Sequence, residues 1–274
     1  MLGVMKKEKN EIRQLVVKTD YHTHSNFSPD GHHTPEAMCA AALNLGLESL
    51  ALTEHAEWFG FQPGFPHVDR YWERIMACQA QFGPEGLTVL PGVELGNPHD
   101  FAVQAGRLLD RYPFAVVIGS IHYLNGHNIH LSQCFSGKES DDVFHDYFVE
   151  LRRMVENFPV DFVAHFDRIF WRAYLLHLPF DPYYHEEVIR EALTAIARHT
   201  GGLELNTKLL GQEPNWHQVL QLLLTWYAEC GGRIVLVNSD AHATTELGQN
   251  QTLALQLLAG TGLEVGKLPQ KVFA

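Results

Sequence analysis

Short runs of apolar and β-branched residues alternate along the chain with longer segments whose apolar residues recur at helical spacing. The short runs predict seven strands, at 15–21, 49–53, 87–95, 115–121, 160–165, 202–206 and 233–238. The longer segments predict helices near 35–46, 68–82, 99–111, 141–157, 184–199, 215–230 and 245–260. Thr34 and Pro35 are typical of a helix start, because Thr caps the first turn and Pro fits its first position. The pattern therefore predicts successive strand–helix units.

Strands this apolar are typical of parallel sheets, which have helices packed over them. An open doubly wound sheet and a closed barrel both fit the predicted order of elements. A barrel gathers functional groups at the C-terminal ends of many strands, whereas an open sheet gathers them at one switch point. Nearly every predicted strand here ends in His, Asp or Glu. We therefore predict an α/β fold of the (βα)7-barrel type, with parallel strands and outer helices.

Composition narrows the class of protein. The 274 residues are 46% hydrophobic, which excludes a disordered chain, and their formal charge of −12 argues against a protein that wraps the nucleic-acid backbone. No apolar run approaches the ~18 residues of a membrane span, so we expect no membrane partner. Four widely spaced cysteines without a CxxC motif are typical of a reduced, cytoplasmic protein. No linker divides the chain, which indicates a single domain.

Potential metal ligands follow the strand ends. In His22-Thr23-His24 the period of a strand places both imidazoles on one face, and Asp240-Ala241-His242 repeats this spacing. The full set of candidates is His22, His24, Asp30, His55, Glu94, His122, His165, Asp240 and His242. This set is too large for one ion, because a catalytic ion takes three protein ligands plus water. Imidazole and carboxylate without thiolate indicate two or three divalent ions, of Zn, Mn or Fe.

The motifs around these residues resemble those of a known family. DYHTHSNFSPDG, LTEH, PGVELG, GSIHY, VAHFD and NSDAH, in this order, are similar to the motifs of the PHP (polymerase and histidinol phosphatase) superfamily, over roughly residues 18–245. The segment from PGVELG through GSIHYLNG is most similar to the stand-alone histidinol-phosphate phosphatases. The resemblance implies one PHP-type domain over 1–274, with a distorted, TIM-like (βα)7 barrel. It also implies hydrolysis of a phosphomonoester, histidinol phosphate of histidine biosynthesis, by a metal-bridging hydroxide.

A trinuclear metal centre is a further implication of the resemblance. His22, His24, Glu94 and Asp240 would hold one ion, Glu94 would bridge to a second ion held by His122 and His165, and Asp30, His55 and His242 would hold the third. Metal ions at such a site neutralise phosphate oxygens and lower the pKa of bound water. The residues expected to be essential for turnover are therefore Glu94, His122 and Asp240.

Two positions depart from the phosphatase pattern. Ser28-Pro29-Asp30-Gly31 stands where these phosphatases often have Cys-Pro-His-Gly, and the Asp form resembles the wider superfamily. Lys208 follows the strand end after which the family commonly supplies an arginine for phosphate. Lys208, as a point charge, or Arg168, as a guanidinium fork, is the candidate for phosphate binding. Arg168 also has an alternative as a surface residue that pairs with Asp167.

Two other functions stay open at this point. One is a nuclease or nucleotide phosphoesterase of the same superfamily, although the acidic charge weighs against a polymeric substrate. The other is a metal-binding module without catalysis, which would require ligands to be missing. The expected partner is a small phosphorylated metabolite, whose ammonium group an acidic wall residue would hold: Glu54, Glu57 or Asp167. Glu54, beside His55, is also a candidate for orienting that ligand. The sequence does not indicate the oligomeric state.

Overall fold

A computed structural model of the protein describes residues 17–60, 63–211 and 216–268. Eight strands in these ranges form one sheet in the order β1-β2-β3-β4-β7-β8-β9-β10, and neighbouring strands run parallel. Their bounds are Thr19–Thr23 (β1), Ser49–Ala56 (β2), Thr88–Gly96 (β3), Val116–Ser120 (β4), Phe162–Val163 (β7), Leu203–Asn206 (β8), Ile234–Asn238 (β9) and Glu264–Val265 (β10).

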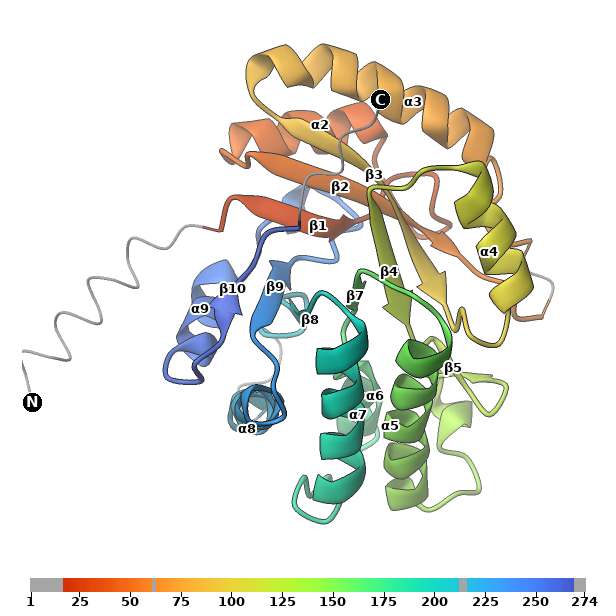
Figure 1. The fold of residues 1–274 in the computed structure, drawn as a ribbon, viewed down its shortest axis with the longest axis vertical. Coiled ribbons are helices and arrows are strands. Elements are labelled where there is room, and N and C mark those ends of the chain that lie inside the picture. The colour runs from red at the N-terminus through yellow and green to blue at the C-terminus, as the bar shows by residue number, and fades with distance from the viewer. Residues whose placement is uncertain (1–16, 61–62, 212–215, 269–274) are drawn as a thin grey trace, which may run out of the picture.

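The sheet curls until β1 returns to β9 (Figure 1). Thr23 of β1 forms an isolated parallel bridge with Ala241, and the amide of His24 donates to the carbonyl of Ala241 at 2.8 Å. β10 pairs with the beginning of β9, at Ile234 and Val235. The strands therefore enclose a common interior, and the predicted parallel barrel with outer helices is confirmed.

Helices cover the outside of the curled sheet (Figure 1). They span Pro35–Asn44 (α2), Val68–Phe82 (α3), Ala102–Arg111 (α4), Ser140–Asn157 (α5), Arg168–Leu175 (α6), Glu186–His199 (α7), Trp216–Glu229 (α8) and Gln251–Leu258 (α9). The predicted start of α2 is confirmed, since the Thr34 hydroxyl accepts from the amide of Ala37 at 3.3 Å. The apolar faces of the helices and the outer face of the sheet form one large buried core.

A second, smaller apolar cluster fills one end of the barrel interior. It consists of Tyr21, Ala51, Leu90, Ala115, Val116, Ile118, Phe162, Ala164 and Leu236. Alternation along a strand places Leu90 on the same face of β3 as Glu94, four residues later. The interior is therefore apolar toward the beginnings of the strands and polar at their ends.

Several elements differ from the apolar pattern. β1 begins at Thr19 rather than at residue 15, although residues 15 and 16 lie outside the described part of the chain. The hairpin of β5 (Tyr123–Leu124) and β6 (His127–Asn128) was not predicted, nor was β10. Each of these strands has two residues, too short to show a period of two. Helix α6, which begins directly after the VAHFD motif, was not predicted either.

Two expectations from composition can be compared with the structure. No described helix is long and apolar enough to cross a membrane. All four cysteines are free thiols; Cys39, Cys78 and Cys134 are buried, and Cys230 is partly buried.

Candidate metal centre

The nine predicted ligands come together at the C-terminal ends of the strands. The ends of parallel barrel strands meet at one mouth, so residues far apart in the sequence become neighbours there. Seven of them line a pocket of about 710 Å³: Asp30, His55, Glu94, His122, His165, Asp240 and His242. His22 and His24 are fully buried and contact Glu94.

Two of these residues have a left-handed backbone conformation. The φ angle is 23° at His165 and 51° at Asp240. Positive φ is uncommon outside glycine and clusters at functional sites, where the surrounding structure enforces it. Each residue lies two positions beyond a strand end, β7 for His165 and β9 for Asp240. The backbone therefore leaves the extended conformation of the strand at these two residues, just beyond the strand ends.

Glu94 lies at the middle of the cluster, and its Oε2 atom faces three imidazoles. Oε2 is 3.3 Å from Nε2 of His22, 3.4 Å from Nε2 of His24 and 2.9 Å from Nδ1 of His55. Nε2 of His22 and Nε2 of His24 also lie 3.7 and 3.5 Å, respectively, from Oδ1 of Asp240. One carboxylate oxygen of Glu94 and one of Asp240 therefore point at the same pair of histidine nitrogens.

The other oxygen of Glu94, Oε1, faces a different pair of histidines. It lies 2.9 Å from Nε2 of His165 and 3.2 Å from Nε2 of His122, and the hydroxyl of Ser120 donates to it at 2.6 Å. The rings of His122 and His165 are stacked, with centroids 5.4 Å apart. The two oxygens of Glu94 thus divide the cluster into two sets of nitrogen atoms, which is the arrangement of a bridging carboxylate.

Asp30 and His242 form the outer part of the cluster. Nε2 of His242 lies 3.1 Å from Oδ2 of Asp30, and Nε2 of His55 lies 3.5 Å from Oδ1 of the same carboxylate. The ring of His24 is stacked on those of His55 and His242, with centroids 4.3 and 4.2 Å apart. The resemblance groups His55 with Asp30 and His242. In the structure His55 also faces Glu94, because its Nδ1 atom lies 2.9 Å from Oε2 of Glu94.

Divalent ions fit these residues. Buried polar atoms in proteins nearly always have hydrogen-bond partners. Here Nε2 of His22, Nε2 of His24, Nδ1 of His55 and Oε2 of Glu94 are buried without one among the described residues. At the mouth there are four sets of three residues, and within each set the donor atoms lie within 4.8 Å of one another. The sets are His22/His24/Asp240, His24/His55/His242, His22/Glu94/His165 and His55/Glu94/His122. Unpartnered imidazole nitrogen and carboxylate oxygen are the donors that Zn, Mn and Fe take.

The protonation of the cluster follows from its charges. Burial alone would raise the pKa of Glu94, but His22, His122 and His55 hold that pKa well below its ordinary value. For Asp240, burial likewise raises the pKa, and Arg168 and Lys208 more than reverse this, so the pKa is well below normal. Both carboxylates are therefore ionised, as ligands must be.

Individual histidines respond differently to the same surroundings. The pKa of His24 is well below its ordinary value because the side chain is buried and lies beside His242 and His55. Burial also lowers the pKa of His165, to about 4, with a further contribution from Arg168. Both imidazoles are neutral at physiological pH, the form that binds a metal.

Arg168 and Lys208 bring positive charge to the pocket, which they both line. The Arg168 side chain is buried and donates to Oδ2 of Asp240, so the alternative of a surface residue is wrong. Nζ of Lys208 donates to the carbonyl of Asp240 at 3.1 Å and to Nδ1 of His242 at 2.8 Å. Both cations therefore lie in the pocket beside Asp240, and Lys208 also contacts His242.

Two carboxylates behind the cluster were not predicted in their observed roles. Nδ1 of His22 donates to Oε1 of Glu204 at 2.8 Å, and Nδ1 of His122 donates to Oε1 of Glu57. Such partners fix the tautomer of a histidine and leave its Nε2 atom free for a metal. Glu204 had a signal in the sequence, as a lone acid between two leucines in a strand. For Glu57 the sequence predicts only a place in the pocket wall, which it also lines.

Glu54 belongs to the support of the centre rather than to its wall. It is fully buried, and it accepts from the hydroxyls of Ser25 at 2.5 Å and Ser28 at 2.6 Å. The oxygen of Ser28 also accepts from Nδ1 of His24 at 3.1 Å and from the amide of His55 at 3.1 Å. Glu54 therefore supports both ligand candidates through Ser28, and its expected contact with a substrate ammonium is wrong.

A parallel barrel with imidazole and carboxylate donors at its mouth defines a metal-dependent class of protein. The sequence profile of the PHP domain matches residues 20–208, and the chain belongs to this family. The resemblance seen in the motifs is thereby confirmed.

Relatives of known name agree with this membership. The chain is 26% identical over 239 residues to the histidinol-phosphatase of Lactococcus lactis, covering 82% of this chain and 84% of the relative. It is 28% identical over 252 residues to a Clostridium acetobutylicum protein named "Probable histidinol-phosphatase", covering 89% and 94%. A crystal structure of the L. lactis histidinol phosphate phosphatase, complexed with zinc, L-histidinol and phosphate, superposes with a TM-score of 0.78 at 24% identity, covering 90% of this chain and 95% of that one.

Proposed function

We propose that this protein is a metal-dependent phosphomonoesterase that hydrolyses L-histidinol phosphate to L-histidinol and phosphate. The observation that carries the proposal is the set of buried, unpartnered imidazole and carboxylate atoms around Glu94, in a pocket that also holds two cations. The names of the two relatives and the ligands of the L. lactis structure support the choice of substrate. A small phosphorylated metabolite also suits a pocket of about 710 Å³.

The residues assigned to metal binding follow from the two faces of Glu94. We assign one ion to His22, His24, Asp240 and Oε2 of Glu94, and a second to His122, His165 and Oε1 of Glu94. Asp30, His242 and His55 are assigned to a third ion. Bound Zn, Mn or Fe at such positions neutralises phosphate oxygens and lowers the pKa of water toward ~7. The proposed complement is therefore two or three divalent ions per chain.

The protein's own residues position the substrate. Arg168 presents a rigid fork of N–H donors suited to phosphate oxygens, and its Nε has no hydrogen-bond partner within the described ranges. Lys208 adds a point charge in the position where the family commonly has an arginine. Phosphoryl transfer asks mainly for positioning and charge stabilisation, which these two residues supply. Glu57 and Glu204 hold the imidazoles of His122 and His22 in place.

A comparison of substrates tests the proposal. Phosphate release is measured with L-histidinol phosphate, nucleoside monophosphates and single-stranded DNA, with Mn, Zn and Fe supplied in turn. We expect L-histidinol phosphate to have the highest kcat/KM and DNA to stay intact, because a chain of charge −12 repels a polyanion. Faster cleavage of nucleotides or DNA would favour the alternative phosphoesterase. Metal binding without turnover of any substrate would favour the non-catalytic module.

A further inference from the structure

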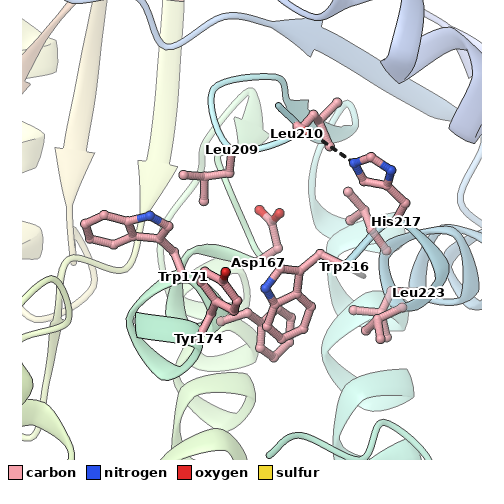
Figure 2. A pocket seen from close by; sticks show the side chains of 11 residues that line it. Asp167, Trp171, Tyr174, Leu209, Leu210, Trp216, His217 and Leu223 are labelled. Carbon is pink, nitrogen blue, oxygen red and sulfur yellow. Dashed lines mark hydrogen bonds between the residues drawn. The ribbon is translucent and has the colours of Figure 1, made fainter. Parts of the chain in front are cut away.

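A second, smaller cavity adjoins the pocket that holds the metal centre. Its volume is about 30 Å³, and its walls are mostly aromatic and aliphatic (Figure 2). Trp171 and Leu209 line both this cavity and the larger pocket, so the two spaces share a wall. A cavity of this size holds a group as large as one or two water molecules but not an aromatic ring.

Asp167 is the only acidic side chain among the described residues that line the cavity. Its carboxylate lies among Leu209, Trp171 and Trp216 in Figure 2. Its Oδ1 atom is buried and has no hydrogen-bond partner among the described residues. An unpaired buried carboxylate is costly, because it loses hydration without gaining a partner. Oδ1 of Asp167 is therefore open to a cation or an N–H donor from a ligand.

Three basic side chains around this part of the fold direct hydrogen bonds to acceptors other than Asp167, although Nε of Arg168 and of Arg172 has no partner among the described residues. Nε2 of His217 donates to the carbonyl of Leu210 at 2.8 Å (Figure 2). Arg168 donates to Asp240, and Arg172 donates to the carbonyl of His130. The chain thus offers Asp167 electrostatic attraction but no direct hydrogen bond from these side chains.

The other acidic residues that were candidates for holding an ammonium group are occupied. Glu54 is fully buried and accepts from Ser25 and Ser28. Glu57 accepts from Nδ1 of His122 through Oε1, and its Oε2 atom is buried without a hydrogen-bond partner among the described residues. Glu54 and Glu57 therefore each support a ligand candidate of the metal centre, a contact that Asp167 does not make.

We propose that Asp167 and the small apolar cavity bind the primary ammonium group of an amino phosphomonoester and thereby select this substrate class. The inference rests on the proposed phosphatase function. An ammonium group is as large as a water molecule and matches the cavity, whereas the ring of the substrate stays in the larger pocket. Apolar walls strengthen the pairing of an ammonium with a carboxylate, because they exclude water from it.

Binding of the dephosphorylated product tests the subsite without turnover. The probes are L-histidinol and its deamino analogue, in which hydrogen replaces the amine, titrated calorimetrically into the metal-loaded protein. We expect L-histidinol to bind about 10- to 100-fold more tightly, the range of one hydrogen-bonded charge pair. This comparison uses the unaltered chain, so it does not depend on the folding of a variant. Equal affinities would overturn the inference.

Asp167→Asn then assigns the preference to this residue. We expect the variant to lose the preference for the amine in both binding and kcat/KM, while turnover of the deamino phosphate stays within about twofold. Asp110→Asn, at an exposed position on α4, is the control with the same change of charge and should retain the preference. An Asp167→Asn variant that keeps the preference, or that loses both substrates equally, overturns the role of Asp167. Amine-selective binding without any phosphate release would overturn the proposed function and leave the subsite standing.

Discussion

The two ends of the barrel interior are built on the same strands and have opposite characters. On β3, Leu90 belongs to the apolar cluster, and Glu94, four residues later on the same face, lies at the middle of the metal centre. On β4, Ile118 belongs to the apolar cluster, and Ser120 donates to Glu94. A step of two or four residues along a strand therefore changes the environment from close packing to a cluster of ionisable groups.

This contrast separates the residues that stabilise the fold from those that carry chemistry. Burying apolar side chains stabilises the folded state, whereas burying carboxylates and imidazoles costs free energy unless they are paired or bind metal. Glu94 is fully buried with an unpartnered Oε2 atom, and Phe162 at the other end is fully buried among apolar neighbours. Substitutions at the two ends should therefore change different measured quantities.

The largest effect is expected for Glu94→Gln, which keeps the shape of the side chain and removes its charge. Both proposed ions adjoining Glu94 should bind weakly, so we expect kcat/KM to fall by a factor of about 10³ or more. In the presence of a chelator, the variant should unfold at a lower temperature than the parent, because the imidazoles that hold the pKa of Glu94 low lose their charged partner.

The control for this variant is Glu150→Gln. Glu150 lies with His99 and Asp100 in another His/acid cluster, which does not line the pocket of the metal centre. Metal analysis and kinetics should show the control unchanged. Full metal content and full activity in Glu94→Gln would contradict a bridging role.

Phe162→Ala, in the apolar cluster, should have the next largest effect, and on stability instead. The side chain has no exposed surface, and truncation of a buried Phe costs about 3–5 kcal/mol of unfolding free energy. Chemical denaturation measures this loss. At a temperature where the variant is folded, its metal affinity should equal that of the parent. A variant that loses metal before it unfolds would show that the two ends are coupled.

The sequence predicts the elements that have enough residues to show a period. Helix α3 was predicted with its observed bounds, and β2 and β3 were located to within a few residues, because each has eight or more residues with a consistent pattern. β10 and the β5–β6 hairpin have two residues each, and their pairing depends on neighbours brought together by the fold. β7 also has two residues, but it was predicted because it lies within the apolar run VDFVAH, whereas no such run marks β10 or the hairpin.

The same reasoning applies to the site. His22 and His24 were found because residues two positions apart in a strand point to the same face, and this spacing can be seen in the sequence. Glu204 lies 182 positions from the histidine that it contacts, and Glu57 lies 65 positions from His122. Their roles arise only when the barrel closes, so residue type and local spacing cannot reveal them.

Glu204→Gln tests how far support behind the metal centre contributes to metal binding. The amide keeps the size of the side chain but is a weaker acceptor for Nδ1–H of His22, so we expect metal affinity to fall about 10- to 100-fold. Competition with a chromophoric chelator measures the dissociation constant independently of activity. Glu229→Gln, on α8, removes an acid that pairs with Arg190 and should leave metal affinity unchanged. Equal affinity in both variants would restrict Glu204 to a structural role.

The smallest and most closely matched effects are expected for Ile118→Val and Ser120→Ala, two residues apart on β4. Ile118→Val deletes one methylene from the apolar cluster and should lower the unfolding free energy by about 1 kcal/mol, with kcat/KM unchanged. Ser120→Ala deletes the hydroxyl that donates to Oε1 of Glu94 at 2.6 Å, and a lost bond to an oriented carboxylate should lower kcat/KM about tenfold. Denaturation and steady-state kinetics on both variants measure the two quantities side by side. If Ile118→Val lowers kcat/KM as much as Ser120→Ala does, packing and chemistry are not separated along the strand, and the contrast between the two ends of the interior fails.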